Sequence, residues 1–358
     1  MTLAASTHGY WNLQTLWFFL IVVLWIGYFV LEGFDFGVGM LSPFIGSNAD
    51  ERGQMIRAIG PVWDGNEVWV IVAGGATFAA FPGWYASLFS GFYLALFILL
   101  VGLIVRGIAI EYRNKKPDPQ WRTRWDYTLA VSSAVPALLW GVALANVVHG
   151  VPTDASGQVT ANLLDLLGPY ALFGGLASLT LFAFHGALFL TLRLTGELES
   201  RARAFALRLA MPAALLVLGF LIWTYVNAAS SHDKGLVPGI VPIAAICLPF
   251  AAGALVRAGK TGWAFAATAG AIALTTLTLF LNMYPRVIVS STNNAFSPTI
   301  FSTSSSHYTL TVMTVVALFF TPIVLLYQGW TYWVFRARVT GETVTPGQYL
   351  AATRLGKN

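Results

Sequence analysis

The chain has 358 residues, of which 57% are hydrophobic and only 10% are charged. Soluble domains carry about 25% charged residues, so a chain of this length cannot build a water-facing surface, and membrane lipid is expected to cover most of it. The net charge of +5 is better explained by Lys and Arg residues held on one membrane face than by binding to nucleic acid. No nucleic-acid partner is therefore expected.

Apolar runs of about 20 residues, the length that an α-helix needs to cross the hydrocarbon core, predict nine transmembrane helices. They are residues 16–41, 59–81, 84–112, 126–148, 170–194, 204–229, 238–256, 262–284 and 308–335. The first is expected to be retained rather than cleaved, because residues 1–16 contain no Lys or Arg and the run is too long for a signal peptide. No loop is long enough for a soluble domain, so residues 1–358 form one all-α integral membrane domain.

The order of the spans is compatible with an internal repeat, residues 10–150 and 165–285, followed by an extra helix at 308–335. The first and fifth spans run in the same direction, and each leads into a charged inner loop and a helix start that contains a proline, Pro61 or Pro212. Two four-helix bundles plus one helix would fit this order. A chance similarity between the two halves of the chain is an equally open alternative, because any two membrane helices joined by a basic loop look alike.

The positive-inside rule orients the chain, because cytoplasmic loops carry an excess of Lys and Arg. With the N-terminus outside and the C-terminus in the cytoplasm, all but two of the 20 basic residues fall on the inner side, and the exceptions are Lys234 and Arg286. Adding or removing one span would scramble this separation. The charge pattern therefore supports an odd number of spans.

Ionisable residues recur at one depth in the first three spans. Glu32 and Asp35 share a face of the first span at i,i+3 spacing, Asp64 and Glu67 do so in the second, and Arg106 lies in the third. At 1.5 Å per residue, all five lie roughly 8–14 Å below the inner surface. Charged groups at this depth are costly and usually face a bundle interior.

Two interpretations of this layer remain open. Carboxyl groups there can exchange protons and form an entry route from the cytoplasm. Alternatively, Arg106 pairs with one or two acids in a structural network, and Asp64 caps the start of the second span. Four acids and one Arg do not balance in charge, so some of the acids must be protonated, hydrated or paired with another chain.

The residues around the acids have simpler predicted roles. Gly33, Gly37 and Gly39 are expected to let another helix pack closely. Trp63 and Trp69 could line a path for a small apolar molecule, although Trp side chains more often fill a gap between helices.

The sequence offers no complete catalytic constellation. Paired His, or His with Met, is needed to hold a haem between helices, and of His8, His149, His185, His232 and His307 only His185 is predicted within the membrane. We expect His185 to be a hydrogen-bonded interior residue rather than a lone haem ligand. No metal site is predicted, and the single Cys247 excludes a disulfide or a Cys-ligated cluster within the chain.

Motifs spread over essentially the whole chain match one family. The matching segments are Gly33-Phe34-Asp35-Phe36-Gly37-Val38-Gly39-Met40, Gly60-Pro61-Val62-Trp63-Asp64-Gly65-Asn66-Glu67-Val68-Trp69, Gly74-Gly75-Ala76, Phe78-Ala79-Ala80-Phe81-Pro82, Phe89-Ser90-Gly91-Phe92-Tyr93, Arg106 with Glu111-Tyr112-Arg113, Trp121-Arg122 with Trp125-Asp126, Pro285, Ser290-Ser291-Thr292 and Leu310-Thr311-Val312-Met313. The first segment resembles the signature DGFDxGVGxL of subunit II of cytochrome bd-type quinol oxidases. Glu32 departs from the usual Asp, Glu67 from the Gln of some members, and the loop after the sixth span is shorter than in some members.

The resemblance implies a partner, subunit I, that carries haem b and haem d, the quinol site and the oxygen chemistry. The complex oxidises a quinol, reduces oxygen to water with protons from the cytoplasm, and works in the aerobic respiratory electron transport of the bacterial cell membrane. This chain alone is then expected to bind no haem. A small third subunit and a structural quinone are compatible with the resemblance.

The resemblance also implies roles for the acids. Asp64 is expected to supply protons, with Asp35, Glu67 and Glu32 in support, Glu111 and Lys115 at the mouth, and Arg106 as the charge partner. Two other functions stay open: a secondary transporter, for which intramembrane acids are also typical, and a purely structural subunit needed for haem insertion in its partner.

Overall fold

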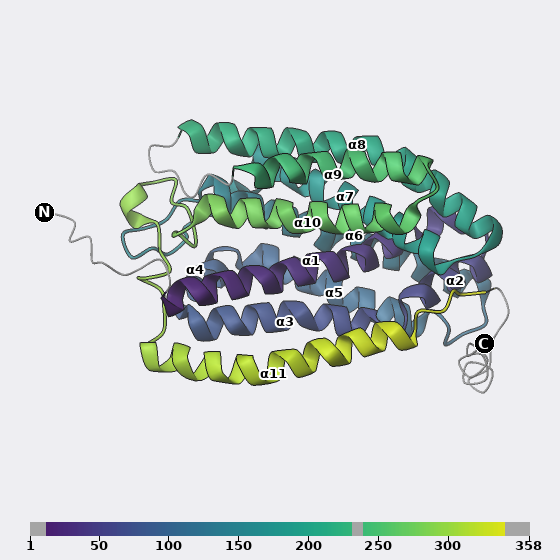
Figure 1. Cartoon of the computed structure of the whole chain (residues 1–358), viewed down its shortest axis with the longest axis horizontal. Coiled ribbons are helices and arrows are strands. Elements are labelled where there is room, and N and C mark those ends of the chain that lie inside the picture. Colours follow the sequence, from purple (N-terminus) through teal and green to yellow (C-terminus); the bar gives the residue numbers. More distant parts are fainter. Residues whose placement is uncertain (1–11, 231–238, 341–358) are drawn as a thin grey trace, which may run out of the picture.

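The computed structural model describes residues 12–230 and 239–340, and these ranges contain helices and isolated β-bridges but no strand. Figure 1 shows long helices lying side by side, with the connecting segments at the two ends of the bundle. The α-helices are α1 (Leu13–Ile45), α2 (Ala49–Ile59), α3 (Trp63–Ala80), α4 (Pro82–Gly91), α5 (Tyr93–Tyr112), α6 (Pro119–His149), α7 (Pro169–Arg193), α8 (Gly196–Ser230), α9 (Ile240–Arg257), α10 (Thr261–Met283) and α11 (His307–Val334). His8, His232, Lys234, Arg354 and Lys357 lie outside the described residues.

Eight of these helices are long and apolar enough to cross a membrane, and they match eight of the nine predicted spans. The remaining span corresponds to α3, which lies beside α1 and α11 (Figure 1). Asp64, Asn66 and Glu67 lower the hydropathy of its first turns. The all-α membrane architecture is therefore confirmed, with nine as an approximate count.

One predicted span was wrong in detail, and one helix was not predicted. The span predicted at 84–112 is broken at Phe92 into α4 and α5. The segment before the second span forms a separate short helix, α2, which Asn48 caps by accepting hydrogen bonds from the Asp50 and Glu51 amides. An Asn cap satisfies two of the backbone N–H groups that a helix start leaves unpaired. Because α2 carries Asp50, Glu51, Arg52 and Arg57, it is the polar helix of the inner end.

α1 and α6 lie at the centre of the described part of the chain, where they contact each other and α7 and α10, and α11 lies at the side. We call α1, α3, α5 and α6 the first helix group and α7, α8, α9 and α10 the second. α11 packs on α1 and α3. Its outer half is fixed by the Trp17 indole, which donates to the Leu310 carbonyl at 3.2 Å and to the Thr314 hydroxyl at 3.0 Å.

Small residues set the distance between α1 and α7. A Cβ atom on Gly37 would collide with the carbonyl oxygen of Phe182 and with the backbone of Gly186, and one on Gly33 would meet the Phe182 ring. The glycines of α1 therefore allow the close helix packing expected from the sequence. Gly39 packs in the same way against Ser133 of α6.

We expect Gly37→Ala to lower the thermal unfolding midpoint of the purified protein. Alanine normally stabilises a helix by about 1 kcal/mol over glycine, but overpacking against rigid backbone costs about 1–3 kcal/mol. Gly262→Ala in α10 is the matched control, because no atom lies within 4 Å of its added Cβ. An unchanged midpoint for Gly37→Ala would show that the crossing is looser than described.

Candidate functional site

A buried ion cluster lies between α1, α3 and α5. The Arg106 guanidinium forms an ion pair with Glu32 and a second one with Glu67, at 3.5 Å between Nη1 and Oε2. Arg106 and Glu32 are fully buried, whereas the Glu67 side chain is 20% exposed. The cluster therefore joins three helices and reaches the protein surface at Glu67.

Aromatic rings enclose the guanidinium of this cluster. The Arg106 Cζ lies 5.0 Å from the centroid of the Phe36 ring and 5.9 Å from that of Trp63. Rings in these positions attract a cation through their quadrupoles while keeping bulk water away. Arg106 is thus held by both carboxylates and π faces.

Asp35 extends the cluster toward α11. It is fully buried, and its Oδ2 accepts a hydrogen bond of 2.7 Å from the Asn66 amide. The Asn66 carbonyl accepts in turn from the Tyr332 hydroxyl at 2.7 Å and from the Gln328 amide at 3.2 Å. Asn66 therefore connects α1, α3 and the inner half of α11.

Three members of the site were not predicted from the sequence: Asn66, Gln328 and Tyr332. Asn66 stands between Asp64 and Glu67 in a polar helix start, which is a usable signal. Gln328 and Tyr332 carried no such signal in the sequence, because polar and aromatic residues near the end of a membrane helix are common.

The charges in the site are unequal. Arg106 is one cation, and Glu32, Asp35 and Glu67 are three carboxyl groups within its network. Such a site is electrically balanced when two of the carboxyl groups hold protons. Because ionised groups are costly in a poorly solvated interior, protons are the natural counterions for the excess acids.

The structure places the other predicted site residues at the surface. Asp64, Glu111 and Lys115 are exposed. The prediction that Asp64 caps α3 was wrong, because Val62 occupies the cap position and no side chain makes the capping hydrogen bond. Asp64 stands one helical turn before Glu67, and so it lies at the exposed edge of the cluster.

The two tryptophans of the α3 motif fill space between helices. Trp63 lies over Arg106 and near Gly107 of α5, and Trp69 packs against Gly27 of α1. Both side chains are half-buried. Their contacts agree with the space-filling role, and a small-molecule path along them stays a prediction.

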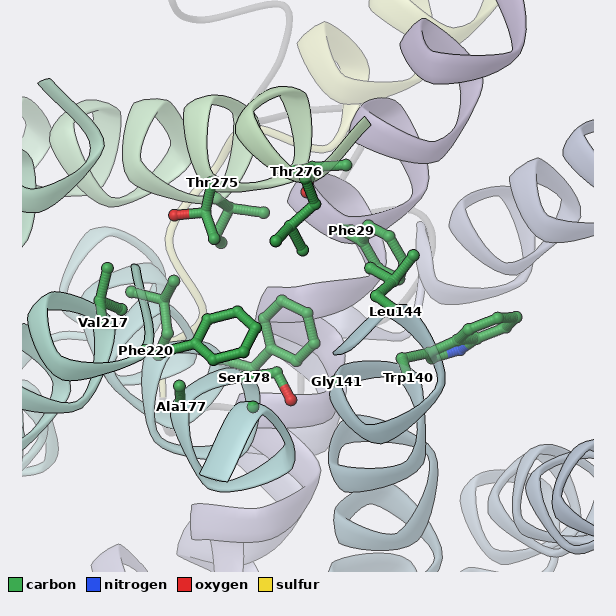
Figure 2. A pocket seen from close by; sticks show the side chains of 15 residues that line it. Phe29, Trp140, Gly141, Leu144, Ala177, Ser178, Val217, Phe220, Thr275 and Thr276 are labelled. Carbon is green, nitrogen blue, oxygen red and sulfur yellow. The ribbon is translucent and has the colours of Figure 1, made fainter. Parts of the chain in front are cut away.

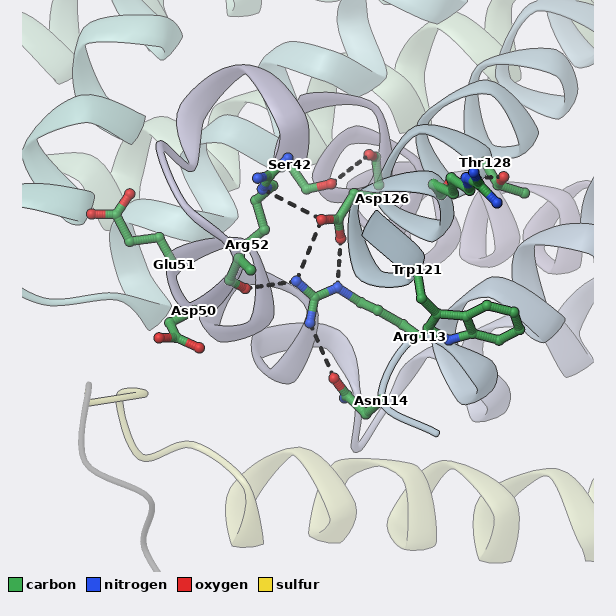
Figure 3. Close-up of polar contacts among 12 residues, drawn as sticks. Ser42, Asp50, Glu51, Arg52, Arg113, Asn114, Trp121, Asp126 and Thr128 are labelled. Atoms are coloured by element: carbon green, nitrogen blue, oxygen red, sulfur yellow. Dashed lines mark hydrogen bonds and ion pairs between the residues drawn. The ribbon is translucent and has the colours of Figure 1, made fainter. Parts of the chain in front are cut away.

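A second ion cluster, around Asp126, was not anticipated (Figure 3). Asp126 of α6 is fully buried and binds Arg113, the residue that follows α5, at 2.5 Å and Arg52 of α2 at 3.4 Å. The sequence signal was weak, since Asp126 stands at the predicted start of a span, where acids commonly meet water.

His185 has both ring nitrogens occupied. Its Nε2 lies 3.2 Å from the Val30 carbonyl, its Nδ1 lies 2.6 Å from the Thr268 hydroxyl, and the ring stacks on Phe265 with centroids 4.3 Å apart. His185 is therefore a hydrogen-bonded interior residue, as expected. Neither nitrogen is available as an axial ligand, so this side chain does not fit a haem.

An apolar pocket with a cavity volume of about 50 Å³ lies between α1, α6, α7, α8 and α10. Figure 2 shows Phe29, Trp140 and Phe220 around it, with Thr275 and Thr276 on the α10 side. A second pocket with a more polar lining includes His149, Tyr170 and Asn282. Apolar walls with a few polar groups are typical of sites for small apolar ligands.

Comparisons with known proteins agree with one another. The sequence model of the family described as cytochrome bd terminal oxidase subunit II matches residues 13–335. Cytochrome bd ubiquinol oxidase subunit 2 of Bacillus subtilis is 40% identical over 92% of this chain and 97% of that protein. Cytochrome bd-I ubiquinol oxidase subunit 2 of Escherichia coli is 37% identical over 93% of this chain and 96% of that protein.

A solved structure supports the fold. The bd oxidase from Geobacillus thermodenitrificans matches with a TM-score of 0.68 at 18% sequence identity, over 88% of this chain and 97% of the matched chain. The sequence matches extend through both helix groups and include the helices that carry the acid cluster. The chain therefore belongs to the cytochrome bd terminal oxidase subunit II family.

Proposed function

We propose that this chain is the haem-free second subunit of a quinol oxidase and that it supplies protons from the cytoplasm while its partner reduces oxygen to water. The observation that carries the proposal is the buried cluster of three carboxyl groups around the single cation Arg106. Haem b, haem d and the quinol site belong to the partner, subunit I. The occupied nitrogens of His185 support a haem-free chain.

The exposures of the acids give the route a direction. Asp64, Glu111 and Lys115 are exposed and can exchange protons with water at the inner side. Glu67 is partly exposed and contacts Arg106, which also contacts the fully buried Glu32. Because each carboxyl group can carry a proton, the series Asp64, Glu67, Glu32 leads inward, with Asp35 as a branch toward α11.

The outward faces of α3, α5 and α11 form the surface that we propose for subunit I. These faces carry large exposed apolar side chains, among them Ile71, Ile104 and Leu326, which are 53–75% exposed.

The distribution of Lys and Arg supports an N-terminus outside and a C-terminus in the cytoplasm of a bacterial cell. This orientation would put Asp64 on the side of proton uptake. Lipid covers the helices that the partner leaves free, and a small third subunit is compatible with this arrangement. The proposed repeat corresponds to the two groups of four helices.

We expect the complex purified through this chain in mild detergent to show the absorption bands of haem b and haem d. The chain stripped of its partner is expected to be colourless, because it offers no fitting axial ligand. A colourless protein that is folded and monomeric before any stripping would contradict the oxidase proposal and favour the secondary transporter.

Replacing Glu67 by Gln or Asp64 by Asn is expected to lower oxidase turnover by about 100-fold at unchanged haem content, because a positioned proton-transfer group contributes about 10²–10⁴-fold. Oxygen consumption and haem content are measured on the same preparation. Glu197→Gln is the matched control, since Glu197 is exposed at the start of α8 in the other helix group.

Each other outcome of this experiment favours a different function. Loss of haem in both variants would favour the purely structural assembly subunit. Normal haem content with normal turnover would show that Asp64 and Glu67 do not supply protons.

The apolar cavity is our proposed site for a structural quinone. Its ring-lined, apolar walls suit a short part of the isoprenoid chain of a quinone. Ala177 of α7 lines the cavity and is buried. We expect Ala177→Phe to fill it, so that less quinone is extracted from the purified complex at unchanged haem content. Ala183→Phe, buried outside the cavity, controls for overpacking, and equal quinone in all three proteins would contradict the site.

A further inference from the structure

The ion cluster around Asp126 joins three helices through one carboxylate. Arg113, the residue that follows α5, donates from Nε to Asp126 Oδ1 at 2.5 Å and from Nη2 to Oδ2 at 3.4 Å, and Arg52 of α2 lies 3.4 Å from the same Oδ2. Arg113 also donates to the Ala49 carbonyl at 2.6 Å. In Figure 3 these groups converge on Asp126, while Asp50 and Glu51 point away from it.

Arg113 is the residue that caps the C-terminal end of α5, seven residues after Arg106. Two helical turns, roughly 10.5 Å along the axis, separate the two residues. The contacts of Arg113 with α2 and α6 therefore fix the rotation and depth of α5 just below the acid cluster. If α5 rotated by a few degrees about its axis, the long Arg106 side chain would move relative to Glu32 and Glu67.

The cluster is closely fitted around Arg113. A Cβ atom on Gly53 of α2 would lie 3.2 Å from Arg113 Nη1, so α2 approaches the guanidinium with its smallest residue. Both Asp126 oxygens accept from guanidinium groups, and the carboxylate is fully buried. Asp126 is thus held in one geometry by two guanidinium groups, which suits a residue that anchors the helix ends.

We propose that Asp126 is a positioning residue for proton uptake: through Arg113 and Arg52 it holds α5 so that Arg106 stays between Glu32 and Glu67. The inference rests on the proposed function of the acid cluster. It gives a role to a residue that lies outside that cluster and touches none of its acids.

The test is a double-mutant cycle on the assembled complex, with turnover measured as a function of pH. Asp126→Asn is expected to lower turnover by about tenfold, since small misplacements of a reacting group are costly, and to move the midpoint of the pH profile in the same direction as Arg106→Lys. In the Arg106→Lys background, Asp126→Asn is expected to add less than about threefold, because residues that act through each other are not additive. Asp126→Glu restores the charge and is expected to recover most of the turnover.

Asp50→Asn is the matched control, because Asp50 is exposed on the neighbouring α2. If Asp126 had only a structural role, Asp126→Asn would lower the yield of complex and leave the pH profile unchanged. Its effect on turnover would then multiply with that of Arg106→Lys in the double variant. That result would overturn the inference. If Asp126→Asn yields no complex, Arg52→Gln removes only the partly exposed partner and enters the same cycle. Unchanged turnover in both Arg106→Lys and Glu67→Gln would instead overturn the proposed function itself.

Discussion

The arrangement depends on one buried cation. Arg106 is fully buried, and an unpaired charge in such surroundings would cost several kcal/mol, so its neighbours must supply negative charge. Glu32 comes from α1 and Glu67 from α3, and a guanidinium that meets both fixes the packing of three helices at once. The site also holds more carboxyl groups than cations, and the proposed proton route depends on that excess.

The glycines of α1 and α7 make this arrangement compatible with tight packing. Because Gly37 and Gly186 bring the two backbones into contact, the face of α1 that carries the glycines is fixed against the second helix group. Glu32 and Asp35 then necessarily point to the other side, toward α3 and α5. The polar and small residues of one short helix segment therefore have complementary tasks: one face joins the two groups, and the other binds the ions.

Much of the architecture could be predicted from the sequence, because the length of an apolar run and the placement of Lys and Arg are local properties. The joint position of Glu32, Asp35, Glu67 and Arg106 followed from spacing and depth. The exposure of Asp64 could not be predicted in this way, because the depth of a residue along a helix does not fix the direction in which its side chain points. Asp126 was missed for a related reason: its burial depends on Arg52 and Arg113 from two other helices. The contacts of Asn66 with Tyr332 and Gln328 join residues more than 260 positions apart, which a single sequence does not reveal.

The attachment of α11 has a consequence for biogenesis. This helix rests on the others through Trp17 near one end and Asn66 near the other, and most of its remaining surface faces outward. It is also the last of the described helices to leave the ribosome. During synthesis, Asn66 therefore stays without its partners Gln328 and Tyr332 until every other described helix has been inserted. The hydrogen bonds that complete the acid cluster form as the closing step of assembly, so a chain released too early would carry an unfinished site.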